Sequence, residues 1–109
     1  MRVSDLLKIE GLELVNNITF DKQIKDFYIS DMLTPLVKNV KDDGICLITL
    51  KNNINSLAAA YLLKMPCVIF CECDSIDEEV INKGNEKNIV IFKTNDSSFV
   101  LTKKLVKYE

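Results

Sequence analysis

Polar side chains that could bind a ligand follow several apolar runs of the sequence. Thr49 and Lys51 lie at the end of the run ICLITL, and Thr94 comes shortly after IVIF. In an open α/β sheet, ligands bind beyond the carboxyl ends of the strands, where helix N-termini point free N–H groups outward. These segments are polar and partly cationic, so they predict a site for a small anionic metabolite or nucleotide. The candidate ligand-binding residues are Ser30, Asp31, Thr49, Lys51, Asn52, Asn53, Thr94, Ser97 and Ser98.

An ordinary structural role competes with ligand binding at these positions. Asn, Ser and Thr are the side chains that cap helix N-termini, and every α/β protein needs such caps. Tyr28, Ser30 and Asp31 could form a binding corner with Asp21 and Lys22. Ser30 or Asp31 equally suits the start of a helix. The sequence leaves both alternatives open.

Cys71 and Cys73 form a second candidate for chemistry. Two thiolates could begin a soft-metal site or a redox pair, but a structural zinc site needs four ligands, and the chain has no histidine. Cys46, Cys67 and Cys71 lie inside apolar runs, where cysteine acts as a small core residue. We therefore expect free thiols, with Cys71 buried and Cys73 exposed, and neither a metal nor another cofactor.

The residue inventory argues against several classes of enzyme. Without histidine, a serine or cysteine nucleophile lacks its usual general base, which excludes a hydrolase triad. The three glycines, Gly11, Gly44 and Gly84, do not form a nucleotide-binding phosphate loop. We predict no catalytic residues.

The composition is typical of one small globular domain spanning residues 1–109. The chain is 48% hydrophobic and 28% charged, with a formal net charge of −2. No segment is basic enough to predict nucleic-acid binding, and no apolar run approaches the ~20 residues that a membrane span needs. Because the chain lacks a secretion signal, we expect a cytoplasmic protein without a membrane partner.

Apolar runs alternate with helical patterns along the chain. Strands are expected at 12–15, 24–29, 45–50, 67–71 and 89–92, and helices begin near Ser4, Ser30 or Asp31, Asn53 or Asn55, Ser75, and Asn95 or Asp96. The runs 45–50 and 67–71 are almost continuously apolar, as strands buried on both faces must be. This order predicts an α/β fold, a three-layer α/β/α sandwich on a mostly parallel sheet.

The sequence resembles the DRTGG domain family, which is related to the N-terminal domain of HPr kinase/phosphorylase. The resemblance begins with FDKQIKDFYISDML and continues through LITLKNNINSLAAA, MPCVIF, IDEEVINKGNEKNIVIF and TNDSSFVLTKKL. Asp21 and Lys22 keep positions of the family's name motif, whereas Lys25, Asp26 and Phe27 replace its threonine and paired glycines.

The resemblance implies a regulatory or protein-interaction module without catalysis of its own. Such domains are often dimeric, and the kinase chemistry of HPr kinase resides in a separate domain. We expect a homodimer, because covering a weak sheet edge near residues 12–15 would stabilise a small sheet. The alternative is a ligand sensor or enzyme that binds an anionic metabolite or nucleotide at the candidate residues.

Overall fold

The computed structural model describes residues 1–16 and 21–108, which form a mixed α/β fold. Its elements are η1 (Val3–Lys8), β1 (Glu13–Leu14), β2 (Asp26–Ile29), α1 (Leu33–Asn39), β3 (Ile45–Thr49), α2 (Ile54–Leu62), β4 (Cys67–Phe70), α3 (Glu78–Lys87), β5 (Val90–Lys93) and α4 (Ser98–Tyr108). None of the helices in these ranges is long and apolar enough to cross a bilayer.

The five strands form one sheet in the order β1-β5-β4-β3-β2. Strands β2 to β5 are parallel to one another, and only the short β1 runs antiparallel to its neighbour β5. The mostly parallel sheet predicted from the sequence is therefore confirmed. Two strands, β1 and β2, form its edges.

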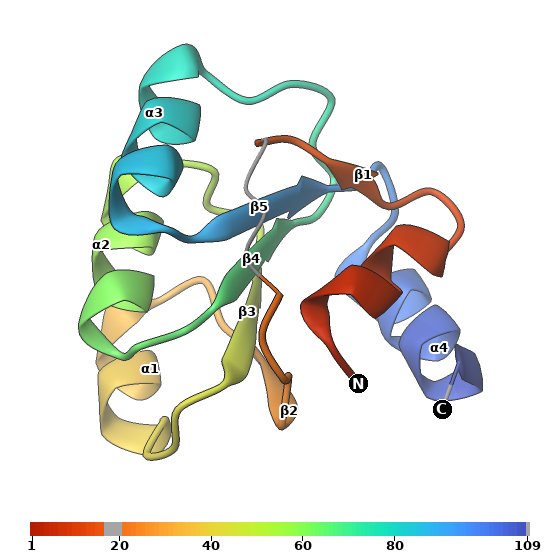
Figure 1. Ribbon diagram of the computed structural model, residues 1–109, viewed down its shortest axis with the longest axis horizontal. Helices are drawn as coiled ribbons and strands as arrows, with labels where there is room; N and C mark the ends of the chain where they lie inside the picture. The colour runs from red at the N-terminus through yellow and green to blue at the C-terminus, as the bar shows by residue number, and fades with distance from the viewer. Residues whose placement is uncertain (17–20, 109) are drawn as a thin grey trace.

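Helices cover both faces of the sheet, which confirms the three-layer sandwich. Helices α1, α2 and α3 lie on one face, while η1 and α4 lie on the other (Figure 1). The two chain ends lie on the same side of the molecule, because η1 and α4 share a layer (Figure 1).

The two faces of the central strands fill two separate hydrophobic cores. In β3, Cys46 and Ile48 pack toward η1 and α4, whereas Leu47 packs toward the three-helix layer. In β4, Ile69 packs toward η1 and α4, and Val68 packs toward the three-helix layer. Successive side chains of a strand point to opposite faces, so a strand covered on both sides must be apolar throughout. The apolar runs at 45–50 and 67–71 are therefore continuous because both faces of β3 and β4 are buried.

Several helices begin at residues other than the predicted ones. Helix α2 begins as expected, because the side chain of Asn53 accepts a hydrogen bond from the Ser56 amide (3.2 Å). The short helix predicted near Ser4 is present as η1, but it begins at Val3, and Arg2 occupies the cap position in place of Ser4. The predicted capping box of Ser75 is also wrong, because α3 begins after Asp77 and has no side-chain cap.

The last helix is capped by Ser97 and not by Asn95 or Asp96. The Ser97 hydroxyl accepts a hydrogen bond from the Val100 amide (3.2 Å), and α4 begins at Ser98. Asp96 forms an ion pair with Lys104 instead (2.6 Å). Ser, Thr, Asn and Asp are similar as caps, so their order within TNDSS does not show which one will serve.

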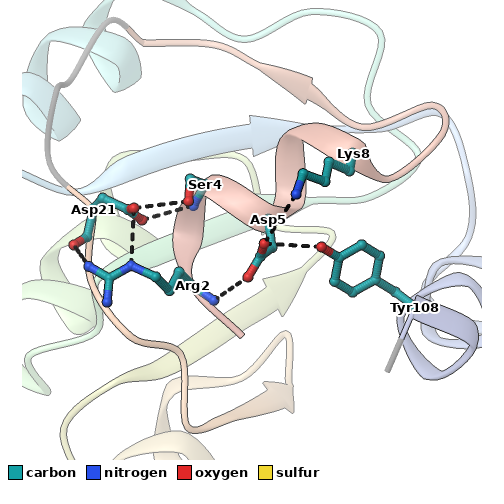
Figure 2. Close-up of polar contacts among 6 residues, drawn as sticks. All are labelled: Arg2, Ser4, Asp5, Lys8, Asp21 and Tyr108. Carbon is teal, nitrogen blue, oxygen red and sulfur yellow. Dashed lines mark hydrogen bonds and ion pairs between the residues drawn. The ribbon is translucent and has the colours of Figure 1, made fainter.

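Two carboxylates hold η1 in place (Figure 2). Asp21 accepts hydrogen bonds from the Ser4 amide and hydroxyl (2.9 Å each) and pairs with the Arg2 guanidinium (3.1 Å). Asp5 accepts a hydrogen bond from the Tyr108 hydroxyl at the end of α4 (3.0 Å). These contacts fasten the amino-terminal segment to the start of β2 and to the last helix.

Candidate functional site

The carboxyl ends of the four parallel strands β2 to β5 all lie on the same side of the sheet, perpendicular to its edge strands. Ser30 and Asp31 follow β2, residues 49–53 lie at the end of β3, and residues 94–98 follow β5. The fold therefore gathers the predicted candidate residues along one edge, because parallel strands end on the same side. Their individual contacts show what each side chain does there.

Asp31 and Thr49 join the ends of β2 and β3. The Thr49 side chain is 2% exposed, and its hydroxyl donates a hydrogen bond to Asp31 Oδ1 (2.9 Å). The same carboxylate oxygen accepts from the Leu50 amide (2.7 Å). Helix α1 begins after Met32 and has no side-chain cap, so the predicted cap at Asp31 is wrong. Asp31 instead stabilises a neighbouring strand end.

Ser30 and Lys51 have local roles at the same corner. The Ser30 hydroxyl donates to the Met32 carbonyl (2.9 Å) and accepts from the Met32 amide (3.2 Å), so it shapes the turn before α1. The Lys51 amide donates to Thr49 Oγ1 (3.1 Å), and its carbonyl accepts from the Ser56 hydroxyl (2.6 Å). Backbone groups of Lys51 therefore shape the turn between β3 and α2.

Asn52 and Cys73 connect the loops that follow β3 and β4. The Asn52 amide nitrogen donates to Cys73 Sγ (3.2 Å), which in turn donates to the Ser75 carbonyl (3.2 Å). Cys73 is 3% exposed, so the expectation of an exposed thiol is wrong. Glu72 adopts a left-handed backbone conformation (φ 49°), and the chain turns inward again at Cys73.

The loop after β5 is bonded in a similar way. Buried Thr94 accepts a hydrogen bond from the Asp96 amide (3.1 Å), and the Ser98 carbonyl accepts from the Thr102 hydroxyl (2.7 Å). Lys104 reaches from α4 to Asp96 and also donates to the Glu10 carbonyl (2.9 Å). No pattern in the sequence indicates this role for Lys104, because its partners lie 8 and 94 residues away.

The four free cysteines pack into the two cores. Cys71 belongs to the core beneath η1 and α4, whereas Cys73 belongs to the opposite core. Burial raises the pKa of the Cys71 thiol to about 11, and the nearby Glu72 carboxylate adds to the shift. Burial also raises the pKa of Cys46. Cys71 therefore stays a neutral thiol at pH 7, the form that is a poor nucleophile and metal ligand.

A shallow groove at these strand ends is lined by asparagines and two carboxylates. The groove, of about 270 Å³, lies between the N-terminal ends of α2 and α3 and is lined by Asn52, Asn53, Asn55, Asp77 and Glu79. Within residues 1–16 and 21–108, no three His, Cys, Asp or Glu side chains come close enough to hold a metal ion. Ligand binding by the nine candidate residues stays a prediction.

The predicted corner of Tyr28, Ser30 and Asp31 with Asp21 and Lys22 is wrong as one constellation. Asp21 precedes β2 and contacts η1, whereas Ser30 follows the other end of the same strand. The Tyr28 hydroxyl accepts a hydrogen bond from the side-chain amide of Asn39 on α1 (2.9 Å). The strand between the two groups separates them by ~3.3 Å per residue.

Comparisons with known proteins agree with this fold. A family model described as the HPr serine kinase N terminus matches residues 47–108, more than half of the chain. No curated protein matches the sequence.

A solved structure supports the same fold across most of the chain. It contains the CBS and DRTGG domains of the regulatory region of a pyrophosphatase from Clostridium perfringens, complexed with its activator, diadenosine tetraphosphate. The TM-score is 0.69 at 17% identity, covering 95% of this chain and 45% of that one. This chain therefore spans less than half the length of the chain in that structure.

The match over β4, β5, α2 to α4 and most of β3 shows the family, and the likeness in fold covers 95% of the chain. The chain belongs to the family of HPr serine kinase N-terminal domains, of the DRTGG type.

Proposed function

We propose that the chain is a non-catalytic regulatory module that pairs with a second copy of itself along the edge strand β2. The observation that carries the proposal is an apolar surface on β2 and α1, which we call the β2 surface. It consists of Ile29, on the side of β2 that faces α4, and of Met32, Leu33 and Val37 at α1 on the other side, so that apolar residues flank the free strand edge from both faces (Figure 1). These residues are 49%, 67%, 47% and 56% exposed. Large apolar side chains grouped on a surface commonly mark a protein contact.

The backbone of β2 could also contribute to pairing with a second copy. Ile24, just before the strand, donates to the Met1 carbonyl (2.7 Å), so the amino terminus covers only the start of this edge. Among the described residues, no strand pairs with the outer side of Asp26–Ile29. An unpaired edge can add a strand, and two copies related by a twofold axis would pair antiparallel with matching donors and acceptors.

A groove beside the strand extends the apolar surface. It has a volume of about 250 Å³ and lies between β2 and α4, lined by Phe27, Ile29, Ile48, Leu105 and Val106 among others. Val106 is 65% exposed at its rim. Apolar side chains of a second copy could fill this groove and exclude water from the paired edge.

The other sheet edge is less suited to pairing than the sequence suggested. Strand β1 has two residues, and its Glu13 forms an ion pair with Lys93 (2.8 Å). Short strands and charged side chains are features that protect an edge from pairing. We therefore place the contact at β2 and not at residues 12–15.

Two further observations support a regulatory role. The strand-end side chains Thr49, Asn53 and Ser97 hold the fold together through their own hydrogen bonds. The similar pyrophosphatase structure carries its DRTGG domain within a regulatory region. A module of this kind would act by changing its contacts with a partner and not by converting a substrate.

Light scattering after size-exclusion chromatography tests the proposal. The wild-type protein should reach the mass of two chains as its concentration rises, and Ile29→Lys should reduce it to one chain. Leu7→Lys is the matched control, because Leu7 is a comparably exposed leucine (58%) on η1. A wild-type protein with the mass of one chain at every concentration would overturn the dimer.

A further inference from the structure

Another cavity opens at the amino-terminal ends of the parallel strands, on the opposite side of the sheet from the strand-end loops. It has a volume of about 500 Å³, within the range of small-molecule sites, and lies between the start of β2 and the C-terminal ends of α2 and α3. Charged and aromatic side chains at its wall are Lys22, Lys25, Asp43, Tyr61, Lys64 and Lys87. Lysines outnumber carboxylates in this wall, in a chain with a net charge of −2, although Lys87 also lies near the Glu86 carboxylate.

Lys25 and Lys64 are available to a ligand. Both side chains are exposed, and neither has an ion-pair partner among the residues that the structure describes. The positive charges of these two lysines and of Lys87 repel one another, so the arrangement carries a cost that a bound anion would lower. The C-terminal ends of α2 and α3 contribute about half an elementary negative charge each, which offsets only part of the positive charge of the lysines.

Lys64 occupies a backbone position that ordinarily belongs to glycine. It follows the end of α2 with φ +56°, and the next amide, that of Met65, donates back to the Ala60 carbonyl (2.8 Å). This is the geometry of a helix end closed by a left-handed residue, where glycine avoids the steric cost that a side chain incurs. Helix termination alone therefore does not explain the lysine.

Tyr61 adds an aromatic face beside these charges. Its ring is 51% exposed, and the Lys87 ammonium lies 4.6 Å from the ring centroid. The contact holds the ammonium at the cavity wall, where its other neighbour is Glu86 (3.8 Å). A cationic cavity with an exposed ring matches a ligand that carries several phosphate groups, with or without a base.

We propose that this cavity binds a small polyphosphorylated molecule, with Lys25, Lys64 and Lys87 contacting its phosphates. The site is separate from the β2 surface and does not depend on dimer formation. The cavity lies at the amino ends of the strands, whereas the nine candidate residues lie at their carboxyl ends. Mutations can therefore distinguish binding in the cavity from binding at the candidate residues.

Isothermal titration with inorganic tripolyphosphate and with ATP, both without metal, tests the proposal. The full chain should bind one equivalent of each, more weakly as salt rises. Lys64→Gly and Lys25→Gln should each raise the Kd about tenfold, as expected for loss of one charge-assisted contact. Glycine suits the left-handed position, so Lys64→Gly removes the charge without endangering the fold.

Two further variants make the test specific. Lys107→Gln, on the exposed end of α4, is the matched control and should bind like the wild type. If the Tyr61 ring contacts the base, Tyr61→Leu should weaken the binding of ATP but not that of tripolyphosphate. If the phosphates alone are recognised, Tyr61→Leu should leave both affinities unchanged. Both results agree with the proposal. Absence of binding, or equal affinity in Lys25→Gln, Lys64→Gly and the wild type, would overturn it.

Discussion

At the scale of single residues, Asp21 shows that a residue in the family's signature region can have a structural role. Its carboxylate accepts hydrogen bonds from the Ser4 amide and hydroxyl, and it pairs with Arg2 (Figure 2). The hydrogen bond from the Ser4 amide, followed by that from the Ser4 hydroxyl, lowers the pKa of Asp21 below 3.8. The folded protein therefore favours the ionised form.

This shift predicts an acid-dependent contribution to stability. Because the folded pKa is lower than the unfolded value, the contribution is present above pH 3.8 and is lost as the pH falls through the folded pKa. Asp21→Asn should lower the melting temperature at pH 7, and its difference from the wild type should shrink in acid. Thermal unfolding across this pH range measures it, with Asp42→Asn as the control. An equal difference at all pH values would contradict the pKa assignment.

Residue roles could be predicted only where the determining contact is local. The prediction of a cap at Asn53 or Asn55 is confirmed for Asn53, whose partner, the Ser56 amide, lies only three residues away. Asp31 was predicted as a cap but contacts Thr49, 18 residues away. Cys73 lies in the core on the side of the three helices and accepts a hydrogen bond from Asn52, which follows a different strand. Spacing along the chain does not encode such contacts, because the fold creates them.

At the scale of elements, helix α3 packs unusually close to strand β5 at Gly84. A Cβ atom placed on Gly84 would lie 2.5 Å from Ile91 Cδ1 and 3.2 Å from Asn16 Nδ2. Asn16 is 2% exposed, donates to the Ile89 carbonyl (2.8 Å) and accepts from the Ile91 amide (2.7 Å). Glycine at position 84 therefore lets the helix, the strand and this amide pack together.

Gly84→Ala should destabilise the protein although alanine favours helices. Overpacking typically costs about 1–3 kcal/mol, which exceeds or offsets the ~1 kcal/mol gained in helix propensity. Ile91→Val removes the clashing Cδ1 atom, so the double variant should lose less stability than the sum of the two single variants. Urea unfolding measures each variant. Additive losses would show that the clash does not govern this position.

The existence and type of most elements followed from the sequence, whereas helix starts did not. The continuous apolar runs around Ile48 and Ile69 predicted central parallel strands because burial on both faces requires such composition. The start of α3 was misplaced because both Ser75 and Asp77 suit a cap, and the path from β4 decides between them.

At the scale of the whole molecule, the sheet has two edges of different character. Strand β1 is short and carries the Glu13–Lys93 ion pair, whereas β2 borders exposed Ile29, Met32 and Val37. The sequence indicated a weak edge near residues 12–15 but not the exposed one at β2. Whether a strand lies at an edge depends on the order of strands in the sheet, which the pattern of the sequence does not fix.

The cationic cavity was missed for a similar reason. Lys25, Lys64 and Lys87 are far apart in the chain, and none lies in a basic run. They converge because they lie near the amino ends of neighbouring strands or at the ends of the preceding helices. Overall charge therefore gave no sign of a local cationic site.

The most direct test of pairing at β2 is amide hydrogen exchange measured by mass spectrometry at increasing protein concentration. We predict that exchange in a peptide covering Asp26–Ile29 slows as dimers form, while exchange in a peptide covering Glu13–Leu14 stays unchanged. Backbone groups that pair between chains lose their access to water, which is the reason for the expected protection. Exchange in β2 that is independent of concentration, or protection that arises at β1 instead, would contradict the proposed interface.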